Sequence, residues 1–130
     1  MFMGNILHKD LSFTLNGILF NVHNNTGRFA SEKQVCDLIE ESLKQNNIKY
    51  RREFILPTEK LIETPGRHRV DFLIENCIIL EIKYKQYLER EDYAQIKRYL
   101  KTLNLALGIL VNFREKRLYP KRILNGSGKE

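Results

Sequence analysis

The stretch from Val70 to Lys83, VDFLIENCIILEIK, limits the possible fold of this chain more than any other segment. It is typical of two β-strands joined by a tight turn, and both alternating faces of each strand are apolar. A strand that is apolar on both faces belongs to a sheet that is covered on both faces. We therefore predict an α/β sandwich in which helices flank the sheet on each side.

One helix is expected before this hairpin in the sequence and another after it. The first spans residues 29–47, with Ser31 and Gln34 as a capping box at its start. Its apolar side chains recur at helical spacing: Val35, Leu38, Ile39 and Leu43. The second spans residues 90–104, with an apolar stripe of Ile96, Tyr99, Leu100 and Leu103.

Further strands are predicted before and after the second helix. Residues 48–57 alternate well enough for a strand, and residues 106–113 form a second apolar run. Residues 117–124 give a weaker strand pattern. The predicted order is therefore one helix, three strands, one helix and two strands.

The region before Gly27 has two possible structures. Asn16 and Gly17 lie between alternating apolar residues, which is a strong hairpin signal. The same residues also fit a helix, because Ile18, Leu19 and Val22 recur at helical spacing.

Composition limits the class of protein. With 130 residues and no internal repeat, the chain fits one globular domain over residues 1–130, with a flexible tail at 126–130. The net charge of +6 suits an anionic partner but does not require one. Cys36 and Cys77 have no zinc-ligand spacing, so we expect two reduced, packed thiols in a cytoplasmic protein. No apolar run approaches the length of a membrane span, so we expect no membrane contact.

Three charged residues interrupt the apolar hairpin: Asp71, Glu81 and Lys83. Glu81 and Lys83 lie two apart on one strand and so share a face. A two-residue turn at Glu75 and Asn76 would place Asp71 opposite Leu80. A three-residue loop or a bulge would instead place it opposite Glu81, and we predict this second register.

Two converging carboxylates repel one another unless a cation lies between them. Oxygen ligands in this arrangement suit Mg²⁺ or Mn²⁺, so Asp71 and Glu81 are candidate metal ligands. Lys83 beside them could orient a water molecule or stabilise charge that develops on a phosphate. The alternative without chemistry is an internal salt bridge between Lys83 and one carboxylate.

The hairpin and the order of elements resemble the PD-(D/E)XK nuclease superfamily, in which an acidic residue on one strand precedes Glu-x-Lys on the next. The resemblance implies a restriction-endonuclease-like αβββαβ core, a mixed sheet flanked by helices on both faces. Four segments are also similar to the GxxExxY family within it: VHNNTGRFASEKQV, VDFLIENCIILEIK, YAQIKRYL and LGILVNF. The chain departs from that family at Val35, where a tyrosine is expected, and at Phe29, where a second glycine is frequent.

The resemblance implies roles for residues outside the hairpin. Glu32 would add an acidic group to the metal site, although a first-turn glutamate is also favoured by the helix dipole. Gln95 and Tyr99 share one helix face, where Gln95 would hydrogen-bond near the metal site or the DNA backbone and Tyr99 would pack or contact substrate. The resemblance also favours a helix over residues 15–25, with His23 as a structural hydrogen bonder or a contact to substrate or metal.

Basic residues are expected around the site. The loop TPGRHR before Asp71 supplies Arg67 and Arg69, which with Lys85 are candidate phosphate contacts. Further positive charge is expected from other residues near the inferred cleft: Arg51, Arg52, His68, Lys97, Arg98 and Lys101.

These features predict a metal-dependent phosphodiesterase that acts on nucleic acid, DNA in preference to RNA, with Mg²⁺ or Mn²⁺ as cofactor. Asp71, Glu81 and Glu32 would hold the metal, and Lys83 and Gln95 would complete the catalytic set. The first alternative is a nucleic-acid-binding module that keeps the fold without cleaving. The second is a small interaction protein of a toxin system or a mobile element. Small nucleases of this superfamily are often dimers, so a homodimer is also expected.

Overall fold

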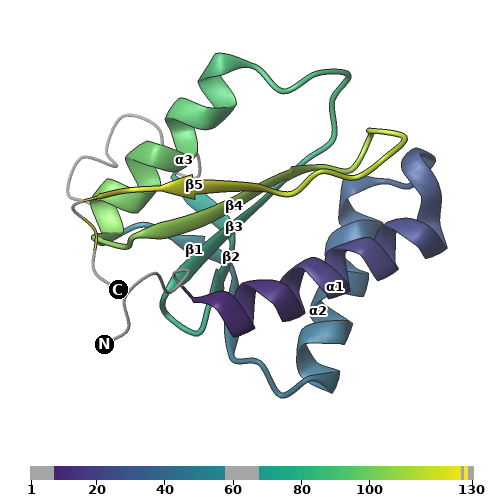
Figure 1. Cartoon of the computed structure of the whole chain (residues 1–130), viewed down its shortest axis with the longest axis horizontal. Coiled ribbons are helices and arrows are strands. Elements are labelled where there is room, and N and C mark those ends of the chain that lie inside the picture. Colours follow the sequence, from purple (N-terminus) through teal and green to yellow (C-terminus); the bar gives the residue numbers. More distant parts are fainter. Residues whose placement is uncertain (1–7, 58–67, 127, 129–130) are drawn as a thin grey trace.

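The computed structural model describes residues 8–57, 68–126 and 128 (Figure 1). Arg67 and most of the expected tail at 126–130 lie outside these residues. The elements follow in this order: α1 (Lys9–Thr26), the 3-10 helix η1 (Gly27–Phe29), α2 (Glu32–Gln45), β1 (Tyr50–Ile55), β2 (Arg69–Ile74), β3 (Ile78–Lys83), α3 (Arg90–Leu103), β4 (Leu107–Asn112) and β5 (Lys121–Leu124). The predicted order of helices and strands is confirmed.

The strands of the described residues form one five-stranded sheet in the order β1-β2-β3-β4-β5. Neighbouring strands are antiparallel except β3 and β4, which run parallel. A parallel pair requires a crossover connection, and α3 provides it between β3 and β4. The mixed α/β sheet that the sequence predicts is therefore confirmed.

The sheet is covered on both faces, as the apolar hairpin requires. In Figure 1, α1 and α2 lie on one side of the sheet and α3 lies on the other. Phe72 and Leu80 belong to the core beneath α1 and α2. Leu73 and Ile79 belong to the core beneath α3. Each such buried side chain contributes about 1.5–3 kcal/mol, so the hairpin stabilises both layers at once.

The ambiguous N-terminal region is helical. Asn16 and Gly17 lie inside α1, which starts at Lys9. A glycine within a helix costs about 1 kcal/mol relative to alanine. Burial of the apolar stripe outweighs that cost, since Leu15 and Leu19 are fully buried. The hairpin alternative is therefore wrong.

The predicted α2 helix is confirmed. Ser31 caps the helix, because its hydroxyl accepts a hydrogen bond from the Gln34 backbone N–H at 3.1 Å. Val35 and Ile39 are fully buried, but Leu38 is 38% exposed. Leu38 therefore lies at the exposed edge of the predicted apolar face, which is not buried throughout.

Tight packing brings α3 close to the sheet. Ile96 and Leu100 are fully buried, whereas Leu103 is only partly buried. A Cβ atom at Gly108 of β4 would lie 2.8 Å from the Ile96 Cδ1 atom. Glycine at this position lets α3 approach the strands, which brings its polar residues toward β3.

The turn between β2 and β3 fixes the register of the charged residues. Glu75 and Asn76 have φ values of 50° and 56°, as in a type I′ turn, and the Cys77 N–H donates to the Ile74 carbonyl at 2.9 Å. Cys77 follows as an extra residue, so Phe72 pairs with Leu80. The predicted three-residue loop is confirmed, and it places Asp71 next to Glu81.

Two other expectations concern the cysteines and the membrane. Cys36 and Cys77 are both free thiols, and burial raises the pKa of Cys36 to about 12, so this thiol stays protonated. Within the described part of the chain, no helix combines the length and the apolar character that crossing a membrane demands.

Candidate active site

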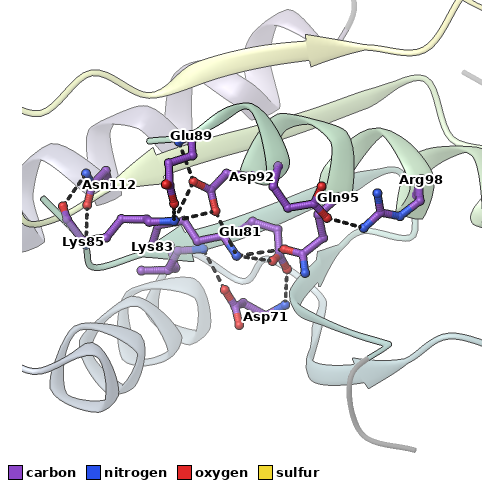
Figure 2. A network of polar contacts seen from close by, with 11 residues as sticks. Asp71, Glu81, Lys83, Lys85, Glu89, Asp92, Gln95, Arg98 and Asn112 are labelled. Carbon is purple, nitrogen blue, oxygen red and sulfur yellow. Dashed lines mark hydrogen bonds and ion pairs between the residues drawn. The ribbon is translucent and has the colours of Figure 1, made fainter. Parts of the chain in front are cut away.

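The two carboxylates of the hairpin lie side by side where the β2–β3 ladder ends (Figure 2). The last backbone pair on this side is Phe72 with Leu80. Beyond it, the Asp71 N–H donates to Glu81 Oε2 at 2.7 Å, and the Ile82 N–H donates to Asp71 Oδ2 at 2.7 Å. Each carboxylate thus takes the place of a backbone acceptor on the facing strand, which fixes its position.

Burial makes it unfavourable for both carboxylates to be charged. Glu81 is only 3% exposed, and its pKa rises to about 8 because burial and the negative charge of Asp71 both disfavour ionisation. The pKa of Asp71 rises to about 6, chiefly through burial, with a smaller contribution from Glu32. The Ile82 N–H opposes this rise at Asp71 by stabilising its charged form. Binding of either a proton or a cation would therefore relieve the repulsion between the two carboxylates.

Lys83 lies beside the pair without closing it. Its ammonium group donates to Gln95 Oε1 at 2.8 Å, and lies 3.9 Å from Glu81 Oε1. The short contact is thus with the neutral amide, so the arrangement differs from a tight internal salt bridge. Gln95 comes from α3 and holds the ammonium group at the edge of the carboxylates (Figure 2).

These side chains open into a cavity of about 370 Å³. The residues that line it include nearly all of the candidates that the sequence indicates and the structure describes: Glu32, Arg69, Asp71, Glu81, Lys83, Lys85, Gln95 and Tyr99. Glu53 also lines this cavity and was not predicted. Its φ of 53° marks an irregular position in β1 opposite Asp71, which sequence periodicity does not reveal.

The donor set fits a divalent cation that keeps part of its water shell. Mg²⁺ commonly binds through one or two carboxylates plus waters and substrate phosphates. Asp71 and Glu81 each have one oxygen held by a backbone N–H and a second oxygen that no N–H of the described strands occupies. Among the described residues, no group of three His, Cys, Asp or Glu side chains is close enough to hold a metal. Glu32 is exposed and faces the same cavity, so it is placed near the pair but not within one cluster.

Two predicted substrate contacts, Arg69 and Lys85, already form ion pairs with acidic residues of the protein. Arg69 forms an ion pair with Glu53 at 3.1 Å. Lys85 donates to Glu89 at 2.6 Å and to Asp92 at 3.0 Å, so two carboxylates share its charge. Arg67 lies outside the described residues.

Tyr99 and His23 have largely buried surroundings. Tyr99 is 4% exposed, and burial raises its pKa to about 12, so it packs in the core beneath α3 with one edge on the cavity. His23 Nε2 lies 2.8 Å from the Glu115 carbonyl oxygen, which can only accept, so this nitrogen donates. The His23 ring also meets Phe113 edge-on at 5.6 Å between centroids. These contacts correspond to the structural role that was expected for His23.

Two of the basic residues expected around the cleft form ion pairs with acidic residues. Arg52 forms ion pairs with Asp37 at 2.7 Å and Glu40 at 2.9 Å, on the side of the sheet that carries α2. Arg98 pairs with an exposed glutamate on its own helix, Glu91, at 2.9 Å. These two arginines therefore contribute less positive charge to the cleft than the sequence suggests.

Two further polar residues near the site were not predicted from the sequence. Asp92 is 7% exposed; its carboxylate accepts the Glu89 N–H at 2.7 Å and lies 3.9 Å from Lys83 Nζ. Asn112 is fully buried at the end of β4, where its amide accepts from the Lys85 N–H and donates to the Lys85 carbonyl. The sequence offered one signal for each residue. Asp92 follows Glu89 at the spacing of a helix capping box, and Asn112 is a polar residue at the end of an apolar strand.

Comparison with known proteins agrees with this geometry. A family model described as the PD-(D/E)XK nuclease superfamily matches residues 9–123, which is most of the chain and includes the whole hairpin. Searches of curated proteins and of solved structures found no significant match. The extent of the family match, together with the αβββαβ order and the paired carboxylates, shows that the chain belongs to the PD-(D/E)XK nuclease superfamily.

Proposed function

We propose that this protein is a divalent-metal-dependent phosphodiesterase that hydrolyses nucleic acid. The observation that carries the proposal is the pairing of Asp71 and Glu81 at the end of the β2–β3 ladder, where each carboxylate is fixed by an N–H of the facing strand. Two buried acids held in this way have raised pKa values, and no cation of the described residues lies in tight contact with them. A divalent cation would supply the missing charge.

Each residue of the site would have its own task. Asp71 and Glu81 would hold Mg²⁺ or Mn²⁺, with Glu32 assisting from the N-terminus of α2. A bound divalent ion supplies Lewis-acid stabilisation of phosphate charge in such sites. Lys83 would orient the attacking water or stabilise charge on the phosphate. Gln95 would keep the Lys83 ammonium group directed at the cavity, since it accepts a hydrogen bond from it at 2.8 Å.

The substrate side of the proposal rests on the cavity wall. Arg69, Lys85 and Tyr99 line the cavity and would contact the nucleic acid, together with Arg67. Membership of the GxxExxY family belongs to this proposal. So do DNA as the preferred substrate, a cytoplasmic location, a homodimer and one domain over residues 1–130.

A cleavage panel tests the proposal. Single- and double-stranded DNA and RNA are incubated with the protein and Mg²⁺, Mn²⁺ or EDTA. We expect metal-dependent cleavage that Asp71→Asn reduces to background and that Lys83→Ala reduces by about 10²-fold or more. Glu91→Gln, which changes an exposed carboxylate on α3, serves as the matched control and should cleave normally. Equal cleavage by wild type and Asp71→Asn would refute the proposed site.

One observation favours a second candidate, a nucleic-acid-binding module without cleavage. Within the described residues, Glu32 does not join Asp71 and Glu81 in a three-group metal cluster. Under this alternative, the wild-type protein binds nucleic acid and cleaves none of the substrates with either metal, and Asp71→Asn leaves binding unchanged.

A further inference from the structure

A second hollow lies at the end of the sheet where strands β3 and β4 end. Three connections contribute its lining: η1, the β3–α3 connection and the β4–β5 connection. Figure 1 shows the segment between α1 and α2 and the β4–β5 connection at the same end of the molecule. We name this lining the basic-aromatic surface, and its residues are Arg28, Phe29, Gln86, Tyr87, Arg114, Glu115, Lys116, Arg117 and Tyr119.

The basic-aromatic surface carries positive charge that is not neutralised. Its cations are Arg28, Arg114, Lys116 and Arg117, against one acid, Glu115. None of the four cations forms an ion pair with a carboxylate of the described residues. Several basic residues elsewhere, on β1 and on α3, are paired with acids. Four unneutralised cations around one hollow suit an anionic chain such as the phosphates of a nucleic acid.

Exposed aromatic rings lie among these cations. Phe29 is 83% exposed, Tyr87 is 70% exposed and Tyr119 is 50% exposed. The Arg28 guanidinium lies 5.0 Å from the Phe29 ring centroid, and Lys121 Nζ lies 5.4 Å from that of Tyr119. Proteins that bind single strands combine basic grooves with aromatic rings on which bases stack. In a duplex the neighbouring pairs cover each base face, so such rings select unpaired bases.

The surface continues directly from the candidate active site. Lys83, Tyr84 and Lys85 line the catalytic cavity, and the next two residues along the chain line the second hollow. The Tyr84 hydroxyl donates to the Arg28 carbonyl at 2.5 Å, which ties η1 to this connection. Between Lys83 and Tyr87 the chain can span at most about 14 Å. That is the length of about four stacked nucleotides at about 3.4 Å each.

We propose that the basic-aromatic surface binds the unpaired bases of a strand whose phosphodiester bond lies over Asp71 and Glu81. This inference rests on the proposed phosphodiesterase and adds its substrate class. The substrate is single-stranded nucleic acid, or a single-stranded segment attached to a duplex. Tyr87 is the central residue, because it follows the catalytic strand and presents a largely exposed ring.

Fluorescence anisotropy with labelled oligonucleotides in EDTA tests this inference without cleavage. The wild-type protein should bind a single strand of about 20 nucleotides more tightly than the duplex of the same sequence. This strand is about five times as long as the four-nucleotide span estimated above. Tyr87→Ala should weaken single-strand binding by about tenfold and leave duplex binding nearly unchanged. Phe13→Ala removes another exposed ring, 80% exposed on α1, and should bind like wild type.

A second pair of variants tests the charges. Replacing Arg114 and Arg117 by alanine should weaken binding and make it less dependent on salt. The slope of log affinity against log salt concentration should become shallower by about 0.7 for each phosphate that the variant no longer neutralises. Lys44→Ala, which removes an exposed lysine on α2, is the matched control. Thermal melting of each variant confirms that the fold is retained.

The outcomes separate this inference from the proposed function. Equal single-strand affinities for Tyr87→Ala and Phe13→Ala, or tighter binding of the duplex, overturn the single-strand surface. Metal-dependent cleavage of single strands that Tyr87→Ala leaves unchanged keeps the phosphodiesterase and overturns this surface. Single-strand binding that depends on Tyr87, with no metal-dependent cleavage, keeps the surface and overturns the phosphodiesterase. Absence of nucleic-acid binding overturns both.

Discussion

The backbone N–H of Asp71 donates to Glu81 Oε2 at 2.7 Å, so one acidic residue of the candidate site holds the carboxylate of the other in place. The Asp71 carboxylate in turn accepts the N–H of Ile82 at 2.7 Å. These bonds orient both groups, but they do not neutralise them. The site is therefore ordered by the sheet while its charge is left for a ligand to balance.

Replacing Glu81 by glutamine should stabilise the metal-free protein. The amide oxygen can still accept the Asp71 N–H, while a buried charge next to another carboxylate is removed. We expect a gain of about 0.5–2 kcal/mol in the free energy of unfolding at pH 8, measured by urea denaturation without metal. Metal-dependent cleavage should be lost. Glu91→Gln on the exposed side of α3 should change neither quantity, and a loss of stability in Glu81→Gln would contradict this account of the charge.

The stability of the metal-free protein should fall as pH rises from about 4 to about 8. The folded-state pKa values of Asp71 and Glu81 are raised to about 6 and about 8, so the folded chain holds more protons than the unfolded chain in this window. Its stability is then greatest below the ordinary carboxylate pKa and declines as each group is forced to ionise. Urea midpoints across this range measure the effect. Glu81→Gln should show a shallower decline, and an equal slope in both proteins would argue against the assignment.

Metal affinity should increase over the upper part of the same window. A divalent cation competes with the protons that Asp71 and Glu81 hold, so binding releases protons and strengthens with pH. Calorimetric titration with Mn²⁺ at pH 6 and pH 8, in two buffers of different ionisation enthalpy, measures both effects. Affinity independent of pH would place the metal elsewhere.

Removing the Gln95 side chain should affect catalysis more than metal binding. Its oxygen accepts a hydrogen bond from Lys83 at 2.8 Å and so restrains the ammonium group. We expect Gln95→Ala to lower kcat by about tenfold while Mn²⁺ affinity stays near the wild-type value. Thr102→Ala, on the exposed face of the same helix, should have wild-type kinetics. An effect confined to KM would assign Gln95 to substrate binding.

Asp92 should matter for stability. Its buried carboxylate accepts the Glu89 N–H at the start of α3 and an ammonium hydrogen bond from Lys85. Asp92→Ala should cost about 1–2 kcal/mol, the usual effect of losing a helix cap. Glu91→Ala breaks only an exposed ion pair and should cost less than about 1 kcal/mol. Equal costs for the two variants would show that the cap contributes little.

Much of the fold could be predicted because the hairpin determines the layers. Both faces of its strands are apolar, which requires helices on each side. The register was predicted on the condition that the side chains of Asp71 and Glu81 lie opposite one another. Local rules failed at Asn16 and Gly17, where a strong turn signal is overridden by burial of the helical stripe. They were incomplete at Leu38, because helical spacing shows which residues share a face but not how much of each side chain is covered.

The candidate site was predictable only in part. Residues close in the sequence, such as Glu81 and Lys83, show their shared face by spacing alone. The roles of Asn112 and Glu53 depend on which strands become neighbours and on an irregular backbone position, which no local pattern states. The basic-aromatic surface was missed for the same reason, since its residues come from three connections that meet only in the folded chain.

The most direct test of the central claim is a crystal structure of the protein soaked in Mn²⁺, with anomalous diffraction recorded at the manganese edge. We predict one strong anomalous peak between the carboxylates of Asp71 and Glu81, with at least one oxygen of each bonded to the ion. A map without a peak between these carboxylates at saturating Mn²⁺, or with the Lys83 ammonium group occupying that position, would contradict the account.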